Sequence, residues 1–494
     1  MFLEVSLALA VFYVIAFITK TWLETRKLPP GPFPLPLIGN LHQLGNNPPY
    51  TMLEMCLKYR DVMTVKFPFG YCLFLNSAEA AREALVTRKT DFAGRPVKEF
   101  YPMNILFEEK DIVTADYGQL FVFRSKVFKS ALHLFGEETE KLEKRLNETV
   151  SLLCSRLDKC VGQKLNIMTI IRSEIIKHMW EWISSERLAY DDPKVQTIIN
   201  FINSISFLGR QGSIFQLIPL LRFLPSQFKR NLDNVLKTRE ELFVGLLEHH
   251  KKTFKSDNLR DITDGMLAAY FKEEKEGKKQ VGTSDDIVFL MMDVIVGGVD
   301  TSVSALNWCL LHLILMEDIQ TKIQEELDTS YEKGKVLTFE EVKKFDYLHA
   351  FVCEVMRSTP LSPLIGLHRT MRETSVMGYS IPKNMLVFLN QHSVNHNPNT
   401  WKNPSVFKPG RFLDENGKFV GWSGIPSFMP FGLGRRACPG RDLGKFEVVM
   451  MLAHLLSRYR IELAENTIAP KLDDPVVQMT SRPKEYMVTI STRN

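Results

Sequence analysis

The stretch Phe431-Gly-Leu-Gly434-Arg-Arg436-Ala-Cys438-Pro-Gly440 decides how the rest of this chain is interpreted. It places one thiol on a short loop with three glycines, where the backbone can turn with positive φ or approach a bulky group closely. Backbone N–H groups and a nearby cation stabilise a thiolate over a thiol. Apolar residues recur with helical spacing after the loop, so we expect the sulfur near the start of a helix. A lone thiolate makes a poor zinc site but suits the axial position of a haem iron, the alternative being a buried structural cysteine.

The composition indicates a large protein from a reducing compartment. A chain of 494 residues with 45% hydrophobic residues can bury a large core. Seven cysteines, an odd number without paired spacing, argue against a disulfide framework. The net charge of +5 is mild and does not point to nucleic acid. We expect the six cysteines outside the loop to pack as small hydrophobic side chains: Cys56, Cys72, Cys154, Cys160, Cys309 and Cys353.

The N-terminus predicts a membrane anchor. Val5–Thr19 is continuously apolar apart from small hydroxyls, and its neighbours extend it to membrane-spanning length. Trp22 suits a membrane interface and no small-residue cleavage site follows, so a retained anchor over residues 1–22 is favoured over a removed signal peptide, with a buried core helix as the alternative. By the positive-inside rule, the basic residues after the apolar stretch Val5–Thr19 place the bulk of the protein in the cytosol: Lys20, Arg26 and Lys27.

The remainder is typical of a helical protein with little sheet. Residues 23–36 are basic and proline-rich, which predicts a stiff spacer before a single domain over residues 37–494. Amphipathic, charge-laced patterns over residues 137–160 and 228–256 indicate surface helices. Strand-like alternation is confined to short stretches: Val62–Phe67, Leu73–Leu75, Met385–Leu389 and Met487–Ile490. The expected fold class is therefore mainly α with small β-sheets.

Asp293–Trp308 (DVIVGGVDTSVSALNW) predicts an apolar helix with a notch. Gly297 and Gly298 each cost about 1 kcal/mol relative to alanine inside a helix. Without side chains they let a flat ligand approach the backbone, or open a kink that a hydroxyl or water fills. Asp300 and Thr301 follow directly, and an acid beside an alcohol at such a notch suits proton delivery. In isolation such a pair is more often solvated or capping.

Together these stretches resemble the cytochrome P-450 family. The pattern Phe-x-x-Gly-x-Arg-x-Cys-x-Gly is similar to its haem-binding loop, which implies Cys438 as the iron ligand and the other fixed positions as cofactor contacts: Phe431, Gly434, Arg436 and Gly440. The notched helix resembles the family's oxygen-activation helix. That resemblance implies that Gly297 and Gly298 adjoin the haem while Asp300 and Thr301 relay protons to dioxygen.

A Glu-x-x-Arg pair, taken alone, is nearly unspecific. Glu354 and Arg357 share a helix face and could be an ordinary surface ion pair of little worth. Phe407-Lys-Pro409-Gly-Arg411-Phe412 lies between this pair and the cysteine loop. The combination resembles the family's structural triad, which implies that Glu354, Arg357 and Arg411 hold the core that supports the haem loop.

Haem propionate contacts are the point at which this sequence departs from the family. The resemblance implies His368 and Arg436 as propionate partners. The family's usual Trp and Arg of a further helix are replaced by Phe121 and Ser125, which leaves Arg124 as a neighbouring candidate. After the cysteine, Arg441 replaces a usual Glu and adds to a basic proximal face with Arg435, Lys445 and Lys126. We expect weaker haem retention or altered reductase docking from these changes.

The resemblance implies a cytochrome P-450 fold behind an N-terminal anchor, with haem b as cofactor. The implied reaction inserts one oxygen atom of O2 into a lipophilic steroid, fatty acid or xenobiotic. Electrons would come from NADPH through a flavoprotein reductase, with cytochrome b5 as a further partner, at the endoplasmic reticulum membrane and on its cytosolic side. A haem-thiolate isomerase or dehydratase that does not need O2, and a degenerate non-catalytic haem protein, are the rival interpretations.

Substrate identity lies beyond the sequence. The resemblance implies a largely apolar lining, drawn from Tyr101–Phe107, Ile112–Thr114, Phe201–Phe207, Val294–Gly297, Leu361–Ile365 and Val476–Val477. Such a lining fits a lipophilic molecule and says little more. The loop around Ile214–Phe223 is apolar enough to dip into a bilayer, and a buried helix is the alternative there.

Overall fold

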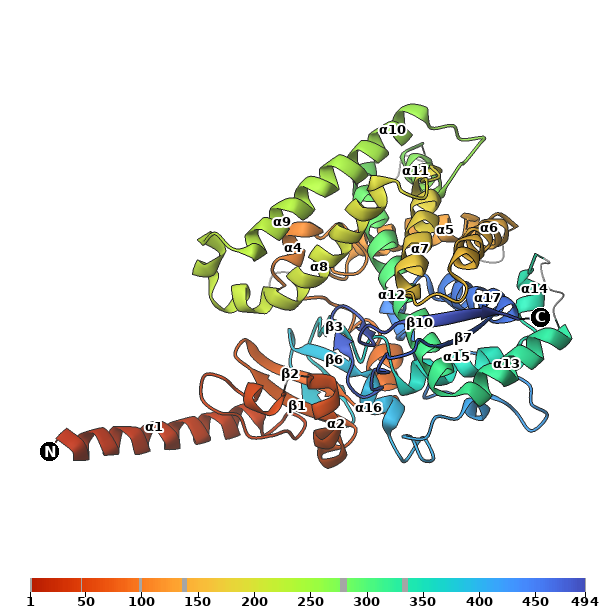
Figure 1. The fold of residues 1–494 in the computed structure, drawn as a ribbon. Coiled ribbons are helices and arrows are strands. Elements are labelled where there is room, and N and C mark those ends of the chain that lie inside the picture. The colour runs from red at the N-terminus through yellow and green to blue at the C-terminus, as the bar shows by residue number, and fades with distance from the viewer. Residues whose placement is uncertain are drawn as a thin grey trace. The chain divides into compact units, whose positions relative to one another are not determined.

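The computed structural model describes residues 2–45, 47–96, 100–135, 140–275, 282–330 and 336–493. Figure 1 shows the course of the chain through its helices and strands. The described residues divide into two compact units, each built from several stretches of the chain. The first unit takes Met1–Pro96, Pro363–Pro404 and Phe431–Ala437. The second takes Val97–Ser362, Ser405–Pro430 and Cys438–Asn494. The single domain predicted over residues 37–494 stays a prediction.

A four-stranded sheet organises the first unit. Its order is β1 (Val62–Phe67), β2 (Gly70–Leu75), β6 (Leu386–Asn390) and β3 (Leu364–Arg369). A tight hairpin joins the antiparallel strands β1 and β2, whereas β2 and β6 pair in parallel. Alternate apolar side chains of β1 and β2 pack with α2 (Pro48–Tyr59) in a buried cluster. The smaller elements are η1 (Leu41–Gln43), α3 (Ala78–Arg82), η2 (Glu83–Thr87), β4 (Thr374–Val376), β5 (Tyr379–Ile381), α16 (Gln391–His396) and η8 (Gly434–Arg436).

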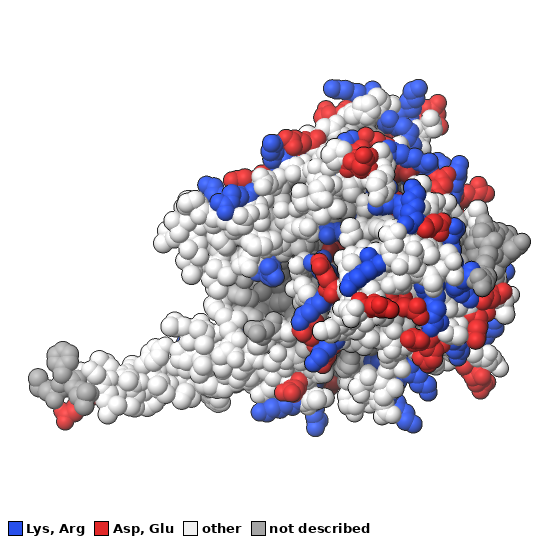
Figure 2. Space-filling model, in the orientation of Figure 1, with Lys and Arg blue, Asp and Glu red and all other residues white. Residues whose placement is uncertain are grey.

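The first helix, α1 (Phe2–Thr25), is exposed along its apolar length. Its best apolar window, within Glu4–Thr25, has a mean hydropathy of 1.8 and is only 6% buried. Figure 2 shows it as an almost uncharged arm. An exposed apolar helix in water is costly, because about 25 cal/mol is lost per Å² of apolar surface left uncovered. The helix is therefore a candidate membrane anchor.

One long helix, α12 (Ile287–Leu315), forms the core of the second unit. Most of its residues are buried, and it packs against α7 (Ile167–Ser184), α15 (Asp346–Ser358) and α17 (Arg441–Arg458). It also passes the length and hydropathy criteria for a membrane span, but 78% of that window is buried inside the protein. Its apolar circumference is therefore explained by packing over most of its surface.

The predicted surface helices of the second unit are confirmed within the described residues. Residues 140–160 form α6 (Glu140–Leu157) and η3 (Asp158–Cys160), while residues 137–139 lie outside the described part. The pattern over 228–256 corresponds to α9 (Gln227–Thr238), the π-helical η5 (Arg239–Val244) and α10 (Gly245–Thr253). The remaining helices are α4 (Met103–Leu106), α5 (Gln119–Phe135), α8 (Pro193–Leu217), η4 (Pro219–Phe223), α11 (Ile262–Lys275), η6 (Ser284–Asp286), α13 (Glu317–Ser330), α14 (Phe339–Val342) and η7 (Pro409–Phe412).

Two short two-stranded sheets complete the second unit. Strand β7 (Tyr459–Leu463) pairs antiparallel with β10 (Val488–Thr492), close to the strand predicted over Met487–Ile490. Strands β8 (Val476–Val477) and β9 (Ser481–Arg482) form the other pair.

The loop after α8 overturns one alternative from the sequence. Its apolar side chains are open to solvent, with Leu220 76% and Phe223 79% exposed. A buried helix over Ile214–Phe223 is therefore wrong.

Candidate functional site

Cys438 is the accessible thiol of the candidate site. It lies just before α17, whose N-cap is Gly440, whereas five of the other cysteines are buried as predicted. Cys160 is partly exposed, so it packs less completely than the other five. Desolvation of the sulfur by the surrounding chain raises the pKa of the Cys438 thiol, although the Gly440 N–H and Arg441 act in the opposite direction. A bound cation is what would make the thiolate dominant here.

Gly434 is required by the packing of its own loop. Its φ is +69°, and a Cβ atom would stand 1.8 Å from the carbonyl oxygen of Leu85 in η2. Backbone cannot yield as a flexible side chain can, so no other residue fits. Gly440 differs, because its φ is −93° and a Cβ atom would meet nothing within 4 Å. Phe431, at the start of the motif, is half-buried.

Arg436 and His368 contact two neighbouring backbone carbonyl groups. Arg436 Nε donates to the Ala93 carbonyl at 2.8 Å, and His368 Nδ1 lies 2.9 Å from the Phe92 carbonyl. A carbonyl only accepts, so Nδ1 carries the proton and Nε2 of the neutral ring is an acceptor. Burial holds the pKa of His368 well below its usual value, and the cations Arg95 and Arg436 act in the same direction. His368 could therefore bind a carboxylate only after protonation, whereas Arg436 is always a cation.

Gly297 and Gly298, the two glycines of the notch in α12, have different roles. Gly297 is exposed on a helix that is mostly buried, and a Cβ atom there would meet nothing within 4 Å. A Cβ atom on Gly298 would stand 3.0 Å from Met179 Sδ, so this glycine serves the close packing of α12 on α7. Thr301 is exposed on the Gly297 side, and its Oγ1 donates to the Gly297 carbonyl at 2.6 Å. The exposed surface of Gly297 and Thr301 is called the α12 hollow below, and α12 continues past it as one helix.

Asp300 points away from Thr301. It is buried, and its Oδ2 accepts a hydrogen bond of 2.6 Å from Thr480 Oγ1. Thr480 Oγ1 in turn lies 2.8 Å from Ser304 Oγ. Sequence analysis missed Thr480 and Ser304, since nothing local marks two hydroxyls 176 residues apart. The acid is thus connected to a chain of hydroxyls.

Glu354 is the centre of a buried charge cluster. It accepts from Arg357 Nε at 2.7 Å and Nη2 at 2.9 Å, and from Arg411 Nε at 3.3 Å. The Lys408 backbone N–H donates to the same carboxylate at 2.7 Å. Both Glu354 and Arg357 are fully buried, so the interpretation as a surface ion pair is wrong. The predicted residues come together, and their geometry fits a structural role.

Arg124 is bonded to other residues of the chain. It is buried, its Nε bonds Asp286 Oδ2 at 2.9 Å, and Nη1 donates to the Glu109 carbonyl. A guanidinium held in this way is fixed away from further partners, so we do not propose Arg124 as a haem contact. Arg441 and Lys445 both pair with Asp442 in the first turn of α17, which reduces the expected excess of positive charge there.

The comparisons with known proteins agree with this geometry. The sequence model of the family described as Cytochrome P450 matches residues 29–490, and the chain therefore belongs to that family. It is a cytochrome P450 monooxygenase, of the class that binds haem b through a cysteine thiolate.

Several relatives are similar along nearly the whole chain. A steroid 17-alpha-hydroxylase/17,20 lyase of Squalus acanthias is 29% identical, covering 93% of this chain and 91% of the relative. Cytochrome P450 1A1 of Canis lupus familiaris is 28% identical, covering 99% and 96%. A solved zebra fish cytochrome P450 with progesterone has a TM-score of 0.79 at 26% identity, covering 90% of this chain and 99% of that one.

The second unit fits a haem on two observations. Cys438 offers one accessible sulfur, the donor that suits a single axial position. The exposed surface of Gly297 and Thr301 on a buried helix leaves a space in which a flat group can lie against the backbone.

Proposed function

We propose that this protein hydroxylates a lipophilic small molecule at a haem held by Cys438, with electrons from NADPH delivered by a flavoprotein reductase. The observation that carries this proposal is the hollow on α12, where Gly297 is open and the Thr301 hydroxyl is exposed. When bound, the haem supplies the reductive activation of O2 that ends with one oxygen atom in the substrate and one in water.

The residues of the chain have separate tasks in this proposal. Cys438 ligates the iron, and the loop around Phe431 and Gly434 fixes the place of its sulfur. Arg436 contributes a permanent cation for a propionate, and His368 contributes a second partner once protonated. Gly440 is the N-cap of α17 and, because it has no side chain, leaves the space beside the start of that helix open.

Proton supply falls to Thr301 and Asp300. The Thr301 hydroxyl faces the hollow and holds a proton at Oγ1 beside the reacting atoms. Asp300 is buried behind it and exchanges protons through Thr480. An acid and an alcohol that are fixed by the same helix suit general acid catalysis. Glu354, Arg357 and Arg411 support the fold and touch no reacting group.

We propose steroids as the first substrate class to test, because relatives are named for steroid hydroxylation. The test is the spectrum of the dithionite-reduced protein with carbon monoxide, followed by NADPH consumption with a reductase and progesterone. A red-shifted Soret band that Cys438→Ser abolishes and Cys160→Ser preserves is expected. An unshifted band in the unmodified protein would overturn the proposal, and substrate rearrangement without NADPH would favour an isomerase.

We propose that α1 anchors the protein in the endoplasmic reticulum membrane with the chain from residue 37 onward in the cytosol, and that residues 23–36 are the spacer. The exposed apolar length of α1 and the basic residues near its end support this placement. Cytochrome b5 is a further electron donor in this setting. Removal of residues 2–27 is expected to move the protein from the membrane to the soluble fraction of cells, and unchanged membrane retention would contradict the role of α1.

A further inference from the structure

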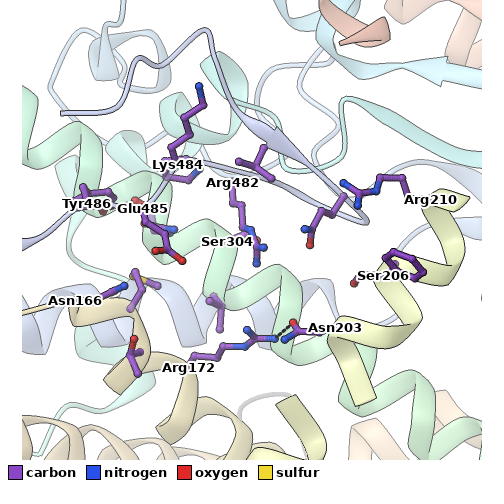
Figure 3. A pocket seen from close by; sticks show the side chains of 18 residues that line it. Asn166, Arg172, Asn203, Ser206, Arg210, Ser304, Arg482, Lys484, Glu485 and Tyr486 are labelled. Carbon is purple, nitrogen blue, oxygen red and sulfur yellow. Dashed lines mark hydrogen bonds between the residues drawn. The ribbon is translucent and has the colours of Figure 1, made fainter. Parts of the chain in front are cut away.

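A second cavity lies in the second unit. Its volume is about 520 Å³, within the usual range of small-molecule sites. The wall comes from α7, α8, α12, the β8–β9 hairpin and the residues after that hairpin (Figure 3). Phe207 and Val476, which line it, come from two stretches that the resemblance implies for the substrate lining, but the function proposed above assigns no role to the basic side chains of this cavity.

The cavity is strongly cationic. Four basic side chains line it, and Glu485 is the single carboxylate among its lining residues. The basic residues are Arg172, Arg210, Arg482 and Lys484. Apolar surface completes the wall, from Met168, Phe207, Val303, Val476 and Pro483. A cavity of this kind matches a ligand that is anionic at one end and apolar at the other.

The arginines lack acidic partners in contact. Arg172 Nη2 donates to Asn203 Oδ1, a neutral acceptor, at 2.8 Å. Within the described part of the chain, Arg210 and Arg482 form no ion pair and no side-chain hydrogen bond. Lys484 is different, since it pairs with Asp474.

Two guanidinium groups approach each other across this space. Figure 3 shows Arg172 on α7 and Arg482 on β9 directed toward the same part of the cavity. Burial lowers the pKa of Arg172 and the charge of Arg482 lowers it further, while Asp300 acts in the opposite direction. Partly desolvated like charges of this kind repel, and an anion between them would remove that repulsion.

We infer that this cavity binds a small organic anion, whose sulfate, phosphate or carboxylate group lies between Arg172 and Arg482 and whose apolar body lies against Phe207 and Val476. Guanidinium groups bind such oxyanions through paired hydrogen bonds. On α12 the site lies mainly on another side of the helix than the α12 hollow. At about 100° per residue, Val303 and Asn307 lie roughly 120–160° around the helix from Thr301, and Ser304 lies about 60° from it.

The site is also connected to the chemistry. Ser304 lines the cavity and bonds Thr480, which donates to Asp300 Oδ2. An anion in the cavity therefore adds negative charge near a carboxylate that the proposed function uses for proton supply.

The test uses the purified holoenzyme in detergent at low ionic strength and the probe 4-nitrophenyl sulfate, measured by isothermal titration calorimetry. We expect one site, at least tenfold weaker binding in the Arg172→Gln/Arg482→Gln double variant, and a change below twofold in Lys484→Gln. The neutral analogue 4-nitroanisole is expected to bind at least tenfold more weakly. If the double variant fails to fold, Arg482→Gln alone gives the comparison.

Two results would overturn the inference. One is equal affinity for the probe in the unmodified enzyme and the arginine variants. The other is a Soret shift on probe binding that an azole ligand of the haem competes away, which would place the probe at the haem. The carbon monoxide spectrum of each variant reports the proposed function separately, and we expect it to be unchanged.

Discussion

Replacement of Glu447 by glutamine should make the free energy of unfolding of the protein less dependent on pH. Glu447 on α17 is fully buried, its Oε2 accepts from Ser302 Oγ at 2.5 Å, and its Oε1 has no partner within the described residues. Burial raises the pKa of this carboxyl from 4.5 to about 7, although the Ser302 hydrogen bond opposes the rise. The folded protein therefore holds a proton that the unfolded chain releases at lower pH.

The sign and size follow from linkage. Because the folded state binds more protons between pH 4.5 and 7, the free energy of unfolding falls as pH rises through that window and levels off above it. One pKa unit corresponds to about 1.4 kcal/mol, so the full loss is about 3 kcal/mol. Glutamine is neutral throughout and does not contribute this loss.

Urea unfolding followed by tryptophan fluorescence from pH 4.5 to 8 measures the difference between Glu447→Gln and the unmodified protein. We expect the variant to gain about 3 kcal/mol relative to the unmodified protein across the window. Glu415→Gln, at an exposed position, is the control and should stay parallel to the unmodified protein. A Glu447→Gln difference that is constant from pH 5 to 8 would refute the reasoning.

Two further substitutions test the loop and the charge cluster. Gly434→Ala should destabilise the protein by at least about 2 kcal/mol and reduce haem content, because its Cβ atom collides with the Leu85 carbonyl at positive φ. Gly444→Ala, where a Cβ atom meets nothing within 4 Å, should be neutral or stabilising, and equal haem content in the two variants would contradict the packing argument. Glu354→Ala should cost about 3–5 kcal/mol of unfolding free energy, since Arg357 would remain charged and buried. A loss below about 1 kcal/mol in urea unfolding would show that the cluster is not structural.

Local pattern was enough to predict much of this fold. The strand predicted over Val62–Phe67 has the same bounds as β1, and the apolar helix predicted over Asp293–Trp308 lies within α12. Motif spacing likewise indicated that Glu354, Arg357 and Arg411 belong together, and the structure brings them into contact.

Long-range packing explains what the sequence left open. The two glycines of α12 look equivalent in the sequence, and only the approach of Met179 from α7 separates them. Arg124 looked available for a ligand because its partner Asp286 lies 162 residues away. The cationic cavity is invisible for the same reason, as its arginines come from three separate elements.

The Glu354 cluster also sets an order of assembly during synthesis. Glu354 and Arg357 emerge together, but Arg411 follows Glu354 by 57 residues. At about 5–20 residues per second, the ribosome needs roughly 3–11 seconds to deliver that partner. During that interval α15 carries a carboxylate that lacks part of its final set of donors, so its burial is delayed. Chaperones that shield exposed helices therefore have several seconds in which to act on this segment of the nascent chain.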